Sequence, residues 1–379
     1  MRVIRQVDVF PVNLPISRSF VFASGSAGHC GGTAGIVYVK VTDSSGEVGW
    51  GEGRPMPSWG YETLESVAST LRLYLIPAVV GQAIWDRMGL HSRMSKAIGR
   101  GPSTGQPIAK AALDMALHDL CAKAAGISLR ELLGGASKVP PLDLSWTCTS
   151  HSETSATEDV EEGLKLGYRH FNFKAAVTPQ TDIAVARAIQ ARAPADAFLW
   201  ADCNQGYTLP DAVRVAQSFE LSGVKLLEQP FPADQPNLLH ELRKRTSIPL
   251  AIDEASVSPS DFFQHVRTGL TDFLVVKLTR TGGIWPTLEQ LGVARSAGLP
   301  VVVSGLTDSS LTKVAAAQVA AAFSVRFPLA LNGSQFLDDS SVFPDKGRWE
   351  HNGQIHLDET PGIGVQPSEE ALRSLAVNV

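Results

Sequence analysis

The chain has 379 residues, of which 44% are hydrophobic and 19% charged, a balance typical of a folded protein rather than a disordered or fibrous one. A net charge of -5 with scattered Lys and Arg argues against binding to nucleic acid or to an anionic membrane. No apolar run is long enough for a membrane span, and the N-terminus does not read as a signal peptide. We therefore expect a cytoplasmic protein with a small-molecule partner, and four free cysteines because no C-x-x-C spacing occurs.

Residues 1–139 predict an α+β domain. Its first segment, VIRQVDVFPV, alternates as a half-buried strand, and the strands GIVYVKVTD and EVGWGEG are joined by a Ser-Ser-Gly turn. Helices are expected over residues 61–80, 84–97 and 106–125, where apolar residues recur at helical spacing. A run of strands followed by a run of helices indicates a separate domain.

Residues 140–354 change to short apolar runs that alternate with amphipathic helices, the pattern of parallel βα units. The runs are PLDLSWT, HFNFKAA, AFLWADC, VKLLEQ, PLAIDE, FLVVKL, PVVVSG and FPLALNG. Polar residues recur at the ends of these runs at intervals of 24 to 28 residues. Because a barrel builds its active site from strand ends, we predict a (β/α)8-type barrel capped by the α+β domain, which residues 355–379 complete.

Asp202, Glu228 and Asp253 end three successive predicted strands. Around a barrel, neighbouring strand ends point toward a common centre, where three carboxylates require a cation. Oxygen ligands without His or Cys favour one Mg²⁺ ion over zinc. The alternative, in which each carboxylate caps a helix or pairs with a surface lysine, does not account for their regular spacing.

Lys174 ends the second predicted strand and Lys277 the sixth, so the two lysines should face each other across the barrel mouth. Burial at a strand end and a nearby cation are expected to lower the pKa of a lysine, as a general base near neutral pH requires. The neighbouring Glu254 could pair with one lysine or support the metal ligands.

Further strings carry a family resemblance: ADCNQGYT, LLEQPF, AIDEA, VVKLTRTGGI and SGLTDSSLTKVAAA, with GWGEG near residue 50 and KAALDMALHDL near residue 110. They resemble the muconate-lactonizing-enzyme subgroup of the enolase superfamily over nearly the whole chain. The mandelate-racemase subgroup is disfavoured because PVVVSGLTD has no histidine.

The resemblance implies roles for individual residues. It makes the three carboxylates the ligands of Mg²⁺ and makes Lys174 and Lys277 the acid/base catalysts that act on the α-carbon of a carboxylate through an enediolate. It also implies site roles for Asn204 and Asp308. Two loops, over about residues 17–33 and 54–61, would cover the barrel mouth. His29 in the first loop and Trp59 in the second are expected to contact the substrate.

Asn172 departs from the family pattern, which has a lysine two positions before Lys174. Asparagine donates hydrogen bonds but brings no charge, which favours a substrate with its own positive charge. Our leading prediction is therefore dehydration of a proline derivative such as cis-3-hydroxy-L-proline, by resemblance to cis-3-hydroxy-L-proline dehydratases.

Other activities stay open. The same lysines could serve a racemase or epimerase of an amino-acid derivative, such as a proline betaine or an N-acyl amino acid, or a cycloisomerase. A barrel that only binds a ligand has no need of opposed lysines. A metal-dependent amidohydrolase would need H-x-H on the first strand, where the sequence reads LSWTCT. We also expect a homo-oligomer.

Overall fold

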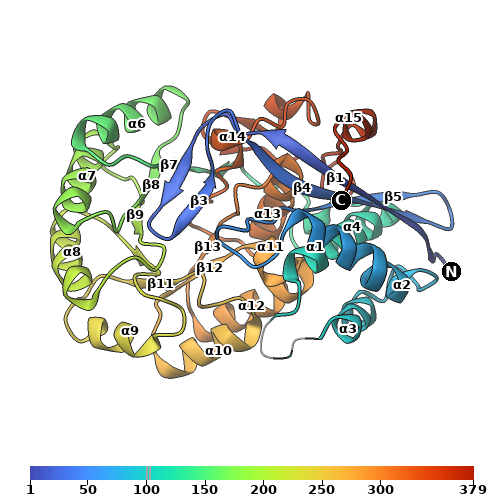
Figure 1. Cartoon of the computed structure of the whole chain (residues 1–379), viewed down its shortest axis with the longest axis horizontal. Coiled ribbons are helices and arrows are strands. Elements are labelled where there is room, and N and C mark those ends of the chain that lie inside the picture. The colour runs from blue at the N-terminus through green and yellow to red at the C-terminus, as the bar shows by residue number, and fades with distance from the viewer. Residues whose placement is uncertain (100, 102–103) are drawn as a thin grey trace.

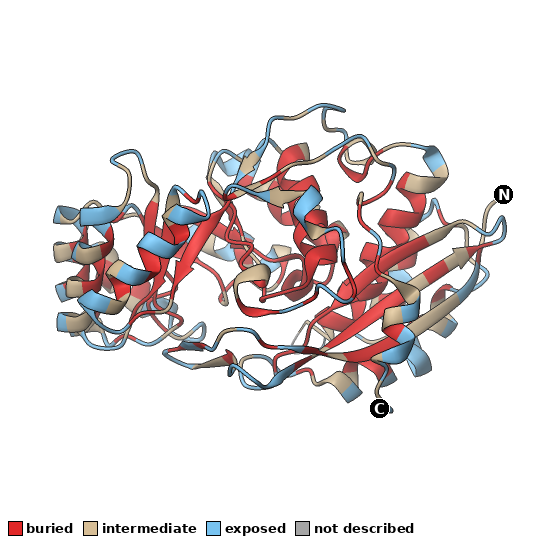
Figure 2. Cartoon of the chain, turned by 90° about the horizontal axis from the view of Figure 1, so that it is seen from above, coloured by how far each residue is buried: buried red, intermediate tan, exposed pale blue. Residues whose placement is uncertain are grey.

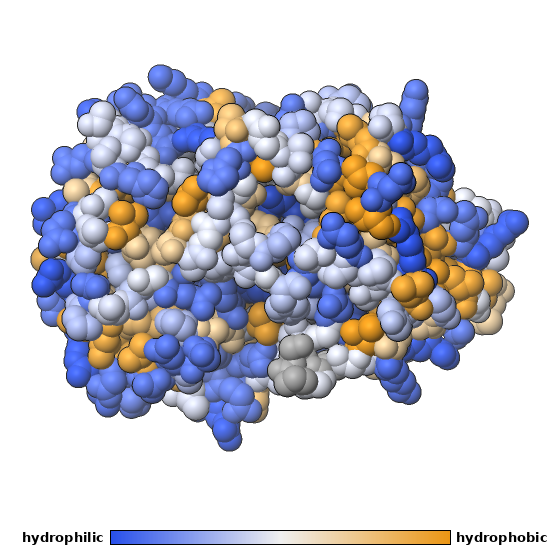
Figure 3. Space-filling model, in the orientation of Figure 1, coloured by the Kyte–Doolittle hydropathy of each residue, from blue (hydrophilic) through white to orange (hydrophobic). Residues whose placement is uncertain are grey.

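The computed structural model describes residues 1–99, 101 and 104–379. An N-terminal capping domain packs against an α/β barrel, and the C-terminus returns to the capping domain (Figure 1). Within these described ranges, no helix has the length and apolar character needed to cross a membrane. The face in Figure 3 is largely hydrophilic, with hydrophobic side chains gathered on its right-hand side, over the capping domain.

The capping domain is built on a three-stranded antiparallel sheet in the order β1-β4-β5. Its strands are β1 (Ile4–Pro15), β4 (Thr33–Asp43) and β5 (Val48–Gly53). Asp43 holds the predicted turn between β4 and β5, because its Oδ1 accepts hydrogen bonds from the backbone N–H groups of Ser45 and Glu47. The predicted strands and hairpin are thus confirmed.

The loop expected over residues 17–33 contains a short hairpin, β2 (Phe20–Phe22) paired with β3 (Gly25–Gly28). This regular structure was not predicted from the sequence of the segment, which is rich in small residues. Phe20 and Phe22 are buried on one side of β2, and Phe20 stacks on Phe336 with ring centroids 4.4 Å apart. Aromatic packing therefore orders the segment.

Alternate glycines let β5 lie directly on the helix α4 (Pro107–Ala125). A Cβ atom at Gly51 would lie 2.0 Å from the carbonyl oxygen of Ala112, and one at Gly49 would lie 2.2 Å from that of Ala116. Only glycine permits so close an approach of the two backbones. The arrangement carries Glu52 toward the barrel, where it accepts hydrogen bonds from Ser309.

Two of the three predicted capping helices differ from expectation at their ends. The helix expected over residues 61–80 begins at Leu64, behind a Thr63 capping box, and contains a wider π-turn before Pro77, which has no N–H to donate. The helix expected over residues 84–97 begins at Arg87, because Asp86 caps it. The segments are α1 (Leu64–Thr70), η1 (Leu71–Leu75), α2 (Ile76–Val79) and α3 (Arg87–Ala97).

The barrel strands form a parallel sheet in the order β13-β12-β11-β10-β9-β8-β7. The strands are β7 (Ser145–Cys148), β8 (His170–Lys174), β9 (Leu199–Asp202), β10 (Leu227–Glu228), β11 (Leu250–Ile252), β12 (Phe273–Val276) and β13 (Val301–Val303). The helices around them are α6 (Glu153–Lys165), α7 (Pro179–Arg192), α8 (Leu209–Leu221), α9 (Pro236–Arg243), α10 (Pro259–Thr268), α11 (Leu278–Thr281), α12 (Ile284–Ala297) and α13 (Ser310–Ala322). The strands are buried and the outer helices expose one side to solvent (Figure 2).

The eighth predicted strand is reduced to two bridging residues. Leu329 bridges to Leu144 beside β7, and Ala330 bridges to Ser304 beside β13, so the two edges of the sheet meet. Pro328 cannot donate a ladder hydrogen bond, and the short helix α14 (Gly333–Phe336) follows almost at once. The barrel therefore closes through a very short eighth segment.

The C-terminal residues contact both parts of the molecule. The strands β14 (Glu350–His351), β15 (Gln354–Ile355) and β6 (Leu142–Asp143) form a small antiparallel sheet in the order β14-β15-β6. The helix α15 (Glu369–Ser374) packs on β1, and Lys40 Nζ lies 2.6 Å from Glu369 Oε2. The short helix α5 (Leu129–Leu132) ends the capping helices.

Candidate active site

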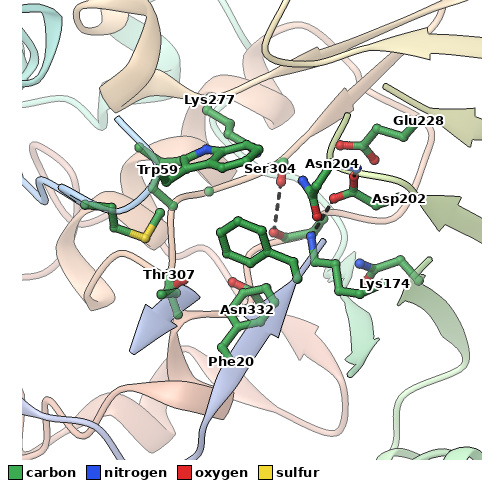
Figure 4. A pocket seen from close by; sticks show the side chains of 17 residues that line it. Phe20, Trp59, Lys174, Asp202, Asn204, Glu228, Lys277, Ser304, Thr307 and Asn332 are labelled. Atoms are coloured by element: carbon green, nitrogen blue, oxygen red, sulfur yellow. Dashed lines mark hydrogen bonds and ion pairs between the residues drawn. The ribbon is translucent and has the colours of Figure 1, made fainter. Parts of the chain in front are cut away.

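One cavity lies at the C-terminal ends of the barrel strands, under the capping loops (Figure 4). Its free volume is about 30 Å³, so it is small. Barrel residues at its wall are Asn172, Lys174, Asp202, Asn204, Glu228, Lys277, Ser304, Thr307 and Asn332, and capping residues are Phe20, Phe22, Ala27, Met56 and Trp59. Most of the residues predicted from the sequence thus line one space.

The three predicted metal ligands stand at the ends of the neighbouring strands β9, β10 and β11, and all are buried. Asp202 and Glu228 line the cavity, whereas Asp253 lies behind Lys277. Burial, followed by the charges of Asp202 and Asp253, raises the pKa of Glu228 well above its ordinary value. The charges of the two neighbouring carboxylates therefore add to the effect of burial on Glu228.

Lys277 and Asp253 form a buried ion pair, with Lys277 Nζ 2.5 Å from Asp253 Oδ2. Arg280, one turn beyond Lys277, also donates to Asp253. The lowered pKa that we expect for the lysine depends on a nearby cation and stays a prediction. Burial acts to lower the pKa of Lys277, but the negative charges of Asp253, Glu228 and Glu254 together outweigh it, and the pKa is raised. Burial likewise acts to raise the pKa of Asp253, but Arg280 and Lys277 hold it below its ordinary value.

Lys174 lies on β8, and Lys277 comes directly after β12. Three strands separate β8 from β12, so the two lysines enter the cavity from well-separated parts of the barrel. Lys174 Nζ donates to Asp202 Oδ2 over 2.5 Å. It also lies 5.1 Å from the ring centre of Phe20 and 5.8 Å from that of Phe22. The capping hairpin thus covers Lys174 with two aromatic faces, which favour a cation.

Asn172 is held in one orientation. Its Oδ1 accepts hydrogen bonds from the hydroxyl groups of Ser145, over 2.8 Å, and Thr147, over 3.0 Å. The Asn332 amide donates to the Thr147 hydroxyl, while Asn332 Oδ1 has no partner. The Asn172 side chain is therefore left with N–H groups to offer the cavity.

Asn204 and Glu254 form a polar pair beside Asp202. Asn204 donates from its backbone to Asp202 Oδ1 and from its side chain to Glu254 Oε1. Burial, followed by the charges of Asp253 and Asp202, raises the pKa of Glu254 to about 8. Its Oε2 and the Asn204 Oδ1 are buried without a partner. Among the described residues, Glu254 forms no ion pair under 4 Å with either lysine. It neighbours the carboxylates instead.

Two other predicted residues lie away from the cavity wall. Asp308 is buried behind it, where its Oδ2 accepts from the Leu306 backbone over 2.7 Å. Burial raises the pKa of Asp308. His29 is exposed and does not line the cavity, because β2 and β3 present Phe20, Phe22 and Ala27 to it instead.

The donor set suits a hard divalent cation, because Asp202, Glu228 and Asp253 supply only oxygen atoms from adjacent strand ends. In the described part of the chain, no three His, Cys, Asp or Glu side chains already surround one point as metal ligands would. The oxygen atoms of Asp202 and Asp253 point to the lysines and Arg280 instead. The burial of Glu228 beside two other carboxylates is the feature that a bound cation would relieve.

Sequence reasoning missed several residues that the site uses. Arg280 stands three residues after Lys277, a spacing that places both on one side of a helical turn, so this contact could have been found. The alternation of Phe20 and Phe22 was a signal for a strand. Asn332 ends the predicted eighth strand and could have been found by the same strand-end rule as the carboxylates.

The comparisons with known proteins agree with this geometry. Residues 155–371 match the family model described as "Enolase C-terminal domain-like", and residues 4–134 match "Mandelate racemase / muconate lactonizing enzyme, N-terminal domain". The chain belongs to the enolase superfamily. The resemblance to its muconate-lactonizing-enzyme subgroup is confirmed, as is the capped barrel fold.

Three relatives show the range of activities in this superfamily. The chain is 30% identical to the chloromuconate cycloisomerase of Delftia acidovorans, over 97% of this chain and 96% of the relative. It superposes on the N-succinyl Arg/Lys racemase of Bacillus cereus with a TM-score of 0.89 and 26% identity, over 99% and 98% of the two chains. A dipeptide epimerase of Enterococcus faecalis, solved with Mg and a dipeptide, gives a TM-score of 0.86 and 25% identity over 96% and 99%.

These relatives place the chain among the enzymes of the enolase superfamily. Members of the superfamily use Mg²⁺, and the chemistry that its cycloisomerases, racemases and epimerases share is Mg-dependent proton abstraction. The relatives differ in substrate, so the family alone leaves open what this chain binds.

Proposed function

We propose that Lys174 and Lys277 remove and return protons at the α-carbon of a small carboxylate substrate. Their positions at the ends of well-separated strands, at the wall of one small cavity, are the observation that carries this proposal. A base on one face of the substrate and an acid on the other allow either elimination or inversion. Asp202, Glu228 and Asp253 would hold one Mg²⁺ ion. When bound, such an ion polarises the substrate carboxylate and stabilises the negative charge that develops there.

The cavity favours a substrate with one carboxylate. Among the described residues at its wall, Lys174 and Lys277 are the cations, and both belong to the proposed acid/base machinery. A second carboxylate would therefore lack a cation of its own, which disfavours muconate-like dianions. Asn172 offers N–H groups to a carboxylate, and the unpartnered Asn332 Oδ1 can accept from a substrate N–H. Both features fit an amino-acid derivative.

Within that class we propose dehydration of a proline derivative such as cis-3-hydroxy-L-proline. In this isomer the hydroxyl group is cis to the carboxylate and therefore trans to the α-hydrogen. One lysine would take the α-proton while the other protonates the departing hydroxyl group, so the C–H and C–O bonds break and water leaves. The small free volume of the cavity suits a compact ring.

Racemisation or epimerisation of an amino-acid derivative is the second candidate, because the same lysine pair serves it and a racemase and an epimerase are among the relatives. Incubation with candidate proline derivatives in D₂O separates the two. A dehydratase releases water from the hydroxylated substrate. A racemase exchanges the α-hydrogen and retains the hydroxyl group.

The expected homo-oligomer stays a prediction. Its support is a set of exposed large apolar side chains on the capping helices and the turns beside them, namely Leu73, Tyr74, Val80, Trp85 and Met88. Apolar side chains that gather on a surface commonly mark contacts with other protein chains.

A further inference from the structure

The loop that follows β13 carries a strained residue to the wall of the catalytic cavity. Thr307 lines this cavity, where Figure 4 labels it, and its φ angle is 59°. Among the residues that the structure describes, Thr307 is the one β-branched residue with a positive φ angle. This region of backbone conformation is unfavourable for a β-branched residue and persists only where neighbouring contacts impose it. The loop therefore depends on contacts that fix its backbone.

Glu52, near the end of β5 in the capping domain, supplies such contacts. Its side chain is fully buried, and its Oε1 accepts a hydrogen bond from the Ser309 N–H over 2.7 Å. Its Oε2 accepts from the Ser309 hydroxyl over 2.6 Å and from the Thr312 N–H over 3.1 Å. Ser309 is the N-cap residue of α13, but its own side chain does not cap the helix. Glu52 caps α13 from the other domain and so fixes the point where the loop meets the helix.

The place of Glu52 is unfavourable for its charge. Burial, followed by the charge of Asp308, raises the pKa of Glu52 to about 7. Arg54 is buried nearby, but its two Nη atoms donate to the carbonyl oxygens of Leu306 and Ala27. Burying a carboxylate costs stability. The hydrogen bonds from the start of α13 offset this cost only while the loop keeps its present form.

We infer that Glu52 is a positioning residue of the reaction, which holds the loop over residues 304–309 in the strained form that sets Thr307 against the substrate. The inference rests on the proposed function, because it takes the catalytic cavity to hold the substrate. Glu52 acts only through this loop. The three metal ligands stand at the ends of other strands, so a change at Glu52 should leave Mg²⁺ binding as it is.

The first test compares glycine with alanine at position 307, because glycine tolerates a positive φ angle and alanine does not. Neither residue carries the threonine hydroxyl, so the comparison reports the strain of the backbone. In protein that keeps Glu52, Thr307→Gly should melt about 2 °C above Thr307→Ala.

Glu52→Gln should reverse this order. Glutamine keeps the shape of the side chain but replaces one acceptor oxygen by an N–H group, so the three hydrogen bonds cannot all form. The loop then relaxes to a negative φ angle, where alanine is the more favourable residue. In the Glu52→Gln background, Thr307→Ala should therefore melt at or above Thr307→Gly.

The second test is exchange of the α-hydrogen of proline derivatives in D₂O with Mg²⁺. Glu52→Gln should lower kcat/KM for exchange by about 10- to 100-fold, the loss typical of a contact that is misplaced from a distance. The Kd for Mg²⁺, measured by titration calorimetry, should equal that of the wild type. Ser309→Ala removes one donor from the barrel side and should move both tests in the same direction, so the inference stays testable if Glu52→Gln does not fold.

Asp119→Asn is the matched control. Asp119 is another buried carboxylate of the capping domain, and it accepts from the Trp50 N–H over 2.8 Å and from the Ile363 N–H over 2.7 Å. It does not line the catalytic cavity. Asp119→Asn should lower the melting temperature but keep the exchange rate, and glycine should stay ahead of alanine at position 307.

Three results would overturn the inference. The first is glycine no more stable than alanine at position 307 in protein that keeps Glu52. The second is the same order of the two variants in Glu52→Gln and Ser309→Ala as in protein without these changes. The third is a loss of exchange in Asp119→Asn as large as that in Glu52→Gln.

Failure of the proposed function would look different. Wild-type protein that neither binds Mg²⁺ nor exchanges any α-hydrogen in D₂O would overturn the proposed function. The melting comparison at position 307 needs no substrate and reports on the hold of Glu52 on the loop in either case.

Discussion

Lys277 and Asp253 are 24 residues apart in the chain, yet Lys277 Nζ lies 2.5 Å from Asp253 Oδ2 in a fully enclosed part of the site. The pair joins a proposed acid/base group to a proposed metal ligand. A divalent ion held by Asp253 would compete with Lys277 for the same carboxylate. The charge of the lysine and the presence of the metal are therefore coupled.

The first prediction concerns this carboxylate. Asp253→Asn keeps the side-chain shape but removes the charge that holds a cation, so the variant should lose Mg²⁺ binding and activity. Titration calorimetry with Mg²⁺ measures the first, and far-UV circular dichroism checks that the fold survives. Asp272→Asn is the control, since Asp272 pairs with Arg243 away from the cavity. An Asp253→Asn protein that binds Mg²⁺ as the wild type does would remove Asp253 from the metal site.

The second prediction concerns Asn172. In Asn172→Lys a second ammonium group would stand near Lys174 and near a positively charged substrate. Two unit charges about 4 Å apart repel by roughly 4 kcal/mol at an effective dielectric constant near 20, which corresponds to about three orders of magnitude in binding. We expect kcat/KM to fall much more for a cyclic amino acid than for the matching uncharged hydroxy acid. Full activity of the variant on the amino acid would show that Asn172 carries no information on substrate charge.

The third prediction concerns a buried ion pair outside the site. Lys313 Nζ on α13 lies 2.6 Å from Glu350 Oε1 on β14, and the lysine side chain is only 3% exposed. Burial acts to raise the pKa of Glu350, but the charge of Lys313 and the Ser334 hydroxyl hold the pKa below its ordinary value of 4.5. A lowered pKa stabilises the folded state above pH 4.5, and this stability is lost as the pH falls through the folded-state pKa.

Glu350→Gln should therefore reduce the free energy of unfolding at pH 7 by about 3 kcal/mol, because it leaves Lys313 buried without its partner. The difference from wild type should shrink as the pH falls below 4.5. Urea unfolding at pH 7 and at pH 4 measures it. Glu241→Gln breaks an exposed ion pair with Arg245 and should change stability little at either pH. A Glu350→Gln deficit that is the same at both pH values would contradict the pairing argument.

The strand-end residues of the site were predictable because their positions follow from the local pattern of apolar runs alone. Lys174, Asp202, Glu228, Asp253 and Lys277 each follow a short apolar run, and a parallel barrel brings such positions together whatever lies between them. The helix α4 was predictable because Ala, Leu and Met dominate its sequence and favour a helix, although it is buried on all sides rather than along one apolar stripe.

Contacts made by the capping loops could not be predicted in this way. The position of Phe20 over Lys174, and the exclusion of His29 from the cavity, depend on how a hairpin docks onto the barrel.

The direction of the Lys277 pKa depends on the exact placement of Asp253, since burial and the ion pair act in opposite directions. The eighth strand was overestimated because Pro328 and the start of α14 leave room for only two bridging residues.

The central claim is that Lys174 and Lys277 serve opposite faces of the substrate. Removing a positioned acid or base typically costs a factor of 10² to 10⁴ in rate, so each variant should show a large and selective loss. The direct measurement is incorporation of deuterium at the α-carbon of the L and D forms of proline derivatives, in D₂O with Mg²⁺, by Lys174→Ala and Lys277→Ala. We predict that wild-type protein exchanges the α-hydrogen of the L form, that only one of the two variants loses this exchange, and that any exchange of the D form depends on the other lysine. Loss of exchange of the L form in both variants, or in neither, would contradict the account.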